Sequence, residues 1–109
     1  MAQISEILAK LLERTNQHEV IWKSTVDERA YITVIGNNSL VIQQDHRPYG
    51  FEMRILNEQG REIDRLQYDG ATSATEQSHL RDLYHQARRV ALGVDSQLEE
   101  LLKELETGT

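Results

Sequence analysis

Two clusters of side chains in this sequence have the chemistry to bind an anion. The first is the segment Asp45–Gly50, in which His46, Arg47 and Tyr49 lie close together. A guanidinium and an imidazole would hold the anion, and the tyrosine ring would add a flat contact surface. The alternative is a solvated loop whose course is set by its proline and glycine, because polar residues are normal in loops.

The second cluster lies on a predicted helix near the end of the chain. At about 100° per residue, Arg81, His85 and Arg88 fall on one flank of the apolar stripe of that helix, beside Arg89. A phosphate group or an acidic partner would fit there. The alternative is intramolecular, with the glutamates of the following helix facing these cations. Exposed ion pairs of that kind contribute only about 0–1 kcal/mol each.

The chain carries no recognisable catalytic or metal-binding motif. It has no cysteine, which excludes disulfides and thiolate chemistry. His79 and His85 are six residues apart and point to different sides of a helix, so they do not form a metal-ligand pair. The sequence has no nucleophile elbow, phosphate-binding glycine loop or dinucleotide fingerprint. We therefore expect no enzyme activity, no metal and no cofactor.

Composition and charge exclude further classes of partner. Twelve basic and eighteen acidic side chains in 109 residues give a net charge of −6, which argues against binding to nucleic acids or anionic membranes. The first residues contain neither a basic patch nor a long apolar run, so we expect no secretion signal and no membrane span. These observations favour a cytoplasmic protein.

The spacing of apolar residues predicts the elements that position these side chains. From about residue 19 to residue 68 the apolar period is two and the turns are short, which predicts an antiparallel meander of four or five strands. Before it, apolar residues recur at helical spacing and predict a first helix. These residues are Ile4, Ile7, Leu8, Leu11 and Leu12.

Two more helices are predicted after the meander. Ser73 or Thr75 caps the first, and Gly93 ends it in a left-handed conformation. Ser96 and Glu99 would form a capping box at the start of the second. The apolar stripe of the first consists of Leu80, Leu83, Tyr84, Ala87 and Ala91, and that of the second of Leu98, Leu101, Leu102 and Leu105.

The order helix, strand meander, helix, helix favours a single α+β domain over residues 1–109. The apolar face of the sheet and the apolar stripes of the helices can each be removed from water by packing on the other. We therefore expect the first helix and a C-terminal two-helix hairpin to pack on one face. The other face would then keep apolar area for a partner or a dimer. Candidate interface residues are Trp22, Tyr31, Thr33 and Ile35, unless the large aromatics simply shield the core.

A Leu-rich first helix, Trp22 in the first strand, the turn Asn57–Gly60 and the stretch Ala87–Asp95 occur together in this chain. That stretch reads Ala-Arg-Arg-Val-Ala-Leu-Gly-Val-Asp. In this combination the chain resembles a group of small, stand-alone bacterial proteins of uncharacterised function. The resemblance extends over nearly the whole chain. It implies the same fold and domain boundaries, and it assigns no activity.

Two functions fit these observations. The first is a non-enzymatic protein-interaction or regulatory module, whose partner is another protein or a second copy in a homodimer. The alternative is a small-molecule or anion-binding protein that uses the 45–50 segment and the arginines of the second helix. A stable dimer or a captured protein partner would favour the first function, and a stabilising ligand would favour the second.

Overall fold

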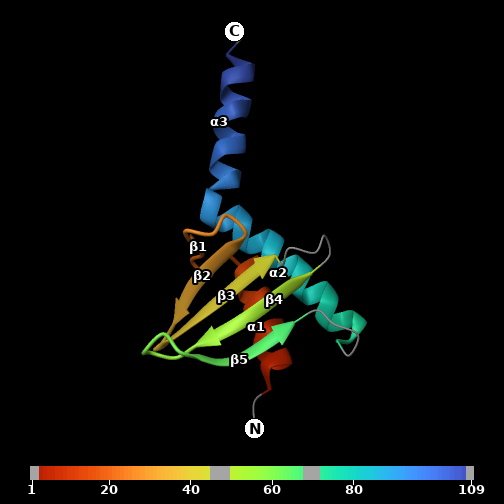
Figure 1. Cartoon of the computed structure of the whole chain (residues 1–109). Helices are drawn as coiled ribbons and strands as arrows, with labels where there is room; N and C mark the ends of the chain where they lie inside the picture. The colour runs from red at the N-terminus through yellow and green to blue at the C-terminus, as the bar shows by residue number, and fades with distance from the viewer. Residues whose placement is uncertain (1–2, 45–49, 68–71, 108–109) are drawn as a thin grey trace.

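The computed structural model describes residues 3–44, 50–67 and 72–107, and it confirms the α+β fold class (Figure 1). Its strands form one antiparallel sheet in the order β1-β2-β3-β4-β5, which is the five-stranded form of the predicted meander. The elements are α1 (Ile4–Asn16), β1 (Lys23–Ser24), β2 (Ala30–Ile35), β3 (Asn38–Gln44), β4 (Phe51–Leu56), β5 (Glu62–Gln67), α2 (Ala74–Leu92) and α3 (Val94–Glu106).

Two helices cover one face of this sheet and form the core with it. α2 packs against β1 to β4, and α1 packs against α2 and β5. Alternate residues of the strands point toward the helices, so Ile42 and Met53 are fully buried opposite each other on β3 and β4. The helix stripes supply the other side of the core, with Leu8 from α1 and Leu83 from α2 also fully buried. The predicted mutual burial of sheet face and helix stripes therefore holds for these two helices.

Three of the predicted interface residues lie in the covered face. Trp22, Tyr31 and Thr33 are only 2–4% exposed. The Thr33 hydroxyl donates a hydrogen bond to the carbonyl of Ile21 at 2.7 Å, which fixes the chain before β1 to β2. The strand period grouped these residues correctly, but their shared face is the one beneath the helices, where they shield the core. Of the four, only Ile35 reaches the surface, with 47% of its area exposed.

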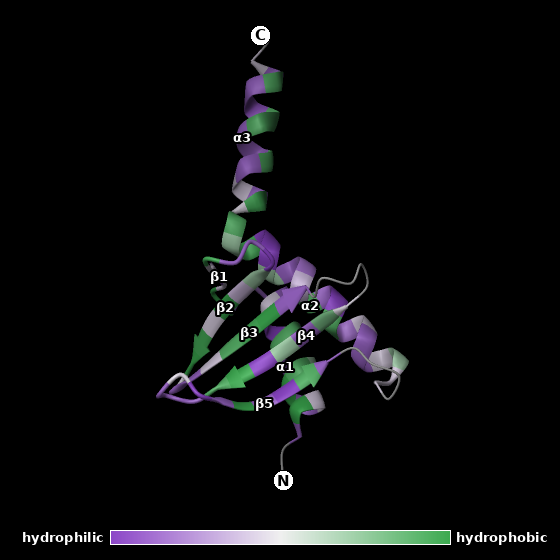
Figure 2. Cartoon of the chain, in the orientation of Figure 1, coloured by the Kyte–Doolittle hydropathy of each residue, from purple (hydrophilic) through white to green (hydrophobic). Residues whose placement is uncertain are grey.

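The opposite face keeps apolar area on β2, where Val34 is 66% exposed as expected, but it is polar over much of β3 to β5. Gln43, Glu52 and Gln67 are direct neighbours across three strands. The buried Glu52 carboxylate accepts hydrogen bonds from both amide groups and lies 3.8 Å from the Arg65 guanidinium. The Arg54 guanidinium donates a hydrogen bond to the side-chain carbonyl of Gln43 at 3.2 Å. Figure 2 shows the resulting hydrophilic bands across these strands.

The ends of α2 match the prediction, and the start of α3 does not. Ser73 forms a capping box, since its hydroxyl accepts from the Glu76 amide at 3.1 Å and the Glu76 carboxylate accepts from the Ser73 amide. Gly93 ends α2 in the left-handed region, at φ 62°. α3 begins directly at Val94, two residues before the predicted Ser96 cap. The Ser96 capping box therefore does not form, and no side chain caps α3.

α3 also differs from the predicted hairpin in its direction. It extends away from the sheet and from the other helices (Figure 1), and none of its residues is buried. The molecule is consequently elongated, with extents of 55 × 31 × 26 Å. Its radius of gyration is 15.6 Å, against about 13 Å for a compact domain of this length. Gly93 causes the change of direction, because it ends one helix and starts the next.

One buried hydrogen-bonded pair joins α1 to the sheet. The Trp22 indole donates to the Thr15 hydroxyl at 3.1 Å, and that hydroxyl donates to the Leu11 carbonyl at 2.7 Å. Replacing Thr15→Val keeps the side-chain shape but leaves the buried indole N–H without an acceptor. We expect the free energy of unfolding to fall by about 1–3 kcal/mol, measured by urea denaturation. The control Thr75→Val, at an exposed threonine of α2, should change it by less; equal effects would contradict the prediction.

Candidate functional site

α3 carries an unburied apolar stripe, called here the leucine stripe. Its four leucines recur at i, i+3, i+4 and i+7 and are 51–74% exposed. Figure 2 shows these hydrophobic residues recurring along α3 between hydrophilic ones. The leucines are Leu98, Leu101, Leu102 and Leu105; helical spacing places Asp95, Glu99 and Glu106 on one border, Glu104 on the other, and Glu100 on the far side of the helix with Ser96.

A helix in this situation lacks the support that normally stabilises it. Isolated helices shorter than about 12–15 residues are marginal in water, and most helical stability comes from packing of the apolar face. α3 has 13 residues, none of them buried, and among the described elements its main contact is with α2 at their junction. Burial of a leucine side chain is worth about 1.5–3 kcal/mol. The leucine stripe is therefore the place on the described surface where contact with another molecule gains most.

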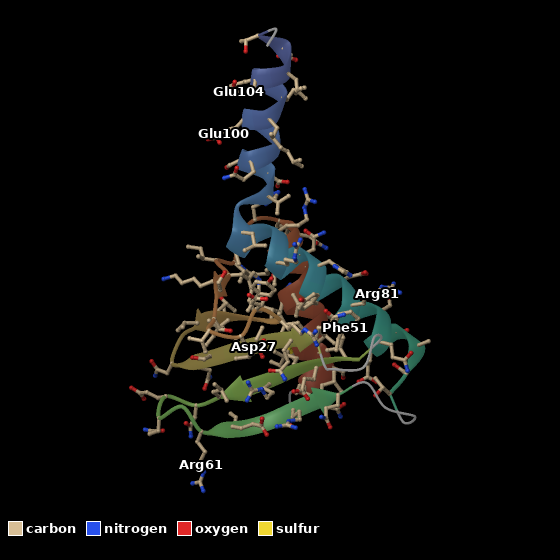
Figure 3. The ribbon with its side chains drawn as sticks, turned by 45° about the horizontal axis from the view of Figure 1, so that its top comes forward. Asp27, Phe51, Arg61, Arg81, Glu100 and Glu104 are labelled. Carbon is tan, nitrogen blue, oxygen red and sulfur yellow. The ribbon has the colours of Figure 1, made fainter. Side chains whose placement is uncertain are left out.

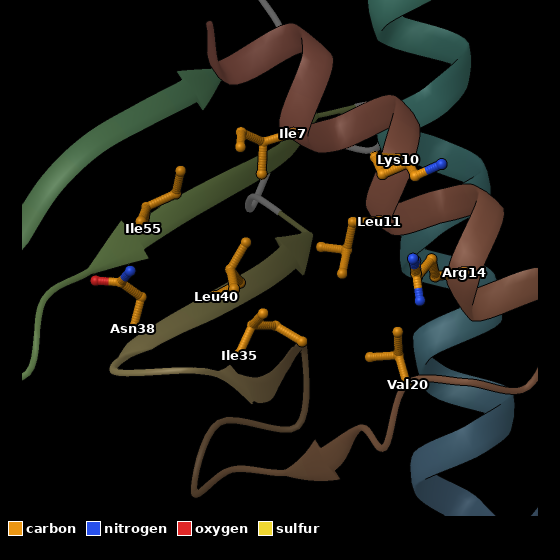
Figure 4. Close-up of a pocket in the computed structure, with 9 residues that line it drawn as sticks. All are labelled: Ile7, Lys10, Leu11, Arg14, Val20, Ile35, Asn38, Leu40 and Ile55. Carbon is orange, nitrogen blue, oxygen red and sulfur yellow. The ribbon is translucent and has the colours of Figure 1, made fainter. Parts of the chain in front are cut away.

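A second apolar surface lies between α1 and the sheet and is called here the groove (Figure 4). It has a volume of about 290 Å³. α1 leans toward α2 and β5, so the end of the sheet at the β2–β3 hairpin is not covered by either helix. The groove opens there, and its apolar lining comes from Ile7, Leu11, Val20, Ile35, Leu40 and Ile55.

Two cations of α1 line the same groove. Lys10 lies 3.3 Å from the Glu13 carboxylate, and Arg14 lies 2.9 Å from that of Glu19. Both basic side chains are more than half exposed, so these ion pairs contribute little to stability and can exchange for other anions. The groove therefore combines an apolar floor with a basic border. The groove could not be predicted from the sequence, because Ile7 and Ile35 have the same spacing as ordinary core residues.

The structure brings Arg81, His85 and Arg88 together on one exposed side of α2, called here the cationic flank. Arg81 lies 3.6 Å from the Asp82 carboxylate, whereas Arg88 has no ion pair within the described residues. The His85 ring meets Phe51, the first residue of β4, with ring centroids 6.1 Å apart. The flank thus lies beside the point where the chain enters β4.

His46, Arg47 and Tyr49, the other predicted ligand-binding residues, lie outside the described residues. The intramolecular alternative for the cationic flank is not what the structure shows. α3 points away from α2, so its glutamates do not face Arg81 or Arg88. The one ion pair that joins the two helices in the described part of the chain is Arg89 with Asp95, at their junction.

Within the described ranges, no three histidine, aspartate or glutamate side chains are close enough together to hold a metal ion. No helix in the same ranges has the length and apolar character needed to cross a bilayer. No protein-family model, curated protein or solved structure matches this chain. The resemblance to small bacterial proteins stays a prediction, and any function must be inferred from the geometry.

Tyr84 connects the core to the cationic flank. Its ring lies 5.6 Å from that of Tyr31 and 5.2 Å from that of Phe51, measured between centroids. Burial raises the pKa of the Tyr84 phenol above its usual value near 10, and the nearby Tyr31 hydroxyl adds to the rise. Arg88 opposes the rise only in part. The folded state therefore favours the neutral phenol.

This pKa shift predicts a loss of stability in alkali. Because the folded pKa of Tyr84 exceeds the unfolded value near 10, its contribution is complete below pH 10 and is lost as the pH rises through the folded pKa. Tyr84→Phe should flatten the fall of unfolding free energy above pH 10, measured by urea denaturation. An absorbance titration of the parent protein should show a late-ionising phenol that is absent from the variant. Four equivalent titrations in the parent protein would exclude the shift.

Proposed function

We propose that this protein is a non-enzymatic protein-interaction module that binds its partner through the leucine stripe of α3. The observation that carries the proposal is the exposure of all four leucines on a helix that has no buried residue. Contiguous exposed apolar side chains bordered by polar ones are typical of protein–protein contact sites. The leucine stripe also has the i, i+3, i+4 and i+7 spacing with which a helix fills an apolar groove.

The edges of the sheet offer a poorer contact. β1 has two residues, so little backbone is free for pairing along that edge. β5 carries Glu62, Asp64 and Arg65, and charged side chains on an edge strand oppose the addition of another strand. These features favour contact through a helix over contact by strand addition. The acidic borders of the leucine stripe further select a partner whose apolar surface has a basic border.

A second candidate function is anion binding at the cationic flank. It is favoured by the contact between His85 and Phe51, which brings the flank beside the end of the 45–50 segment. Arg88 is exposed and has no ion pair within the described residues, whereas Arg81 is paired with Asp82.

The leucine stripe is tested by adding charge to it. Leu101→Glu with Leu105→Glu should abolish self-association or capture of a partner, because burial of the two leucines would then require burial of two carboxylates. The binding constant should fall at least about tenfold, measured by sedimentation or by affinity capture from the source cell. Unfolding free energy should stay within about 0.5 kcal/mol, since both leucines are exposed.

Ser96→Glu is the matched control, because it adds charge on the side of α3 that faces away from the leucine stripe. A complex that survives this substitution and is lost with the leucine variant supports the proposal. If the parent protein is a monomer at high concentration and captures the same proteins as the leucine variant, the proposed function is wrong.

Anion binding at the cationic flank is tested with inorganic pyrophosphate. A specific anion stabilises the folded state by mass action, so pyrophosphate should raise the melting temperature of the parent protein. Arg88→Ala should remove the rise, whereas Arg61→Ala should keep it. Arg61 is a suitable control because it is exposed in the β4–β5 turn, which is distant from α2 in Figure 3. Equal responses of the two variants would exclude the site.

A further inference from the structure

We propose that the leucine stripe binds in the groove of a second copy of this chain, so that two copies exchange their α3 helices in a closed dimer. The inference rests on the proposed function, because it uses the same stripe. It adds the partner and the surface that receives the helix. The chain itself then supplies both halves of the contact.

The size and chemistry of the groove suit a helix better than a small ligand. Its volume of about 290 Å³ lies just below the range of about 300–1,000 Å³ that is usual for small-molecule pockets. Its lining is aliphatic apart from Lys10, Arg14 and Asn38, so it offers few polar groups to orient a cofactor. Aliphatic side chains that enter from a helix need no such orientation. The leucine stripe presents side chains of this kind in a row.

Charge distinguishes the groove from other surfaces that could receive the leucine stripe. α3 has five acidic side chains and one basic one, Lys103. If two leucine stripes paired with each other, the acidic borders of both helices would meet, and like charges would oppose the contact. The groove instead offers Lys10 and Arg14, whose exposed ion pairs can exchange for Glu99 and Glu104 on the two borders of the stripe. Charge therefore favours the groove over a second α3.

The position of α3 makes the recipient a second copy. α3 leaves the body at the end of α2, whereas the β2–β3 hairpin that bounds the groove lies at the other end of the sheet (Figure 1). Its 13 residues span about 20 Å, and they point away from the groove of the same chain. Two copies related by a twofold axis would each give one helix and receive one. Such an arrangement closes, so it stops at a dimer.

Disulfide trapping tests this contact directly, because the chain has no cysteine of its own. We would mix full-length protein that carries Ile35→Cys with full-length protein that carries Leu101→Cys and oxidise the mixture. We expect the mixed disulfide to exceed at least about twofold the proportion that random pairing gives. Val34→Cys is the matched control. Val34 is 66% exposed and adjacent, but its side chain lies on the opposite face of β2, so it should trap no more than random pairing gives.

The other outcomes overturn the inference in different ways. If Leu101→Cys proteins link mainly to each other, leucine stripes pair with leucine stripes, and the proposed function survives without the groove. If Ile35→Cys and Val34→Cys form the mixed disulfide with Leu101→Cys equally well, the groove does not receive the leucine stripe. That conclusion holds whatever sedimentation of the Leu101→Glu, Leu105→Glu variant shows.

A charge exchange gives an independent readout of the same contact. Lys10→Glu with Arg14→Glu, and separately Glu99→Lys with Glu104→Lys, should each weaken dimerisation at least about tenfold. A mixture of the two variants should form heterodimers more tightly than either variant forms homodimers, measured by sedimentation. No recovery in the mixture would overturn the inference.

Discussion

The apolar face of the meander must be removed from water, and α1 and α2 are the elements that cover it. Ile42 and Met53 are fully buried because Leu8 and Leu83 pack over that face from the two helices. The pair of Trp22 and Thr15 then fixes the end of α1 against the start of the sheet through a buried hydrogen bond. The position of α1 and α2 over the sheet therefore determines which apolar surfaces stay exposed.

The same constraint produces the two surfaces that remain apolar. α2 runs along most of the sheet and α1 leans toward β5, so the hairpin end of the sheet keeps Ile35 at the surface and the groove opens there. The two helices leave no comparable sheet area for a third, and α3 therefore keeps its leucines exposed. The uncovered end of the sheet and the uncovered face of α3 both leave apolar side chains in water. Contact between two copies would remove both sets of side chains from water.

The sequence predicted the features that depend on local residues. The strand order and short turns follow from period-two spacing, and the Ser73 cap and the left-handed Gly93 follow from residue type. The position of α3 was not predictable, since its apolar spacing equals that of α1 and shows only that the helix needs a partner. Likewise, strand period grouped Tyr31 with Ile35, but it contains no information on which face the helices cover. The groove depends on the tilt of α1, which no local pattern determines.

The distribution of charge explains how a monomer can carry an exposed leucine stripe. Most of the net charge of −6 belongs to α3, so separate copies repel each other most strongly where they are most apolar. Repulsion of this kind opposes indiscriminate contact between leucine stripes and is relieved only by a surface that brings cations. Lys10 and Arg14 border the groove and meet that condition. Burial of apolar area thus drives the contact between copies, while charge determines which apolar surface the leucine stripe binds.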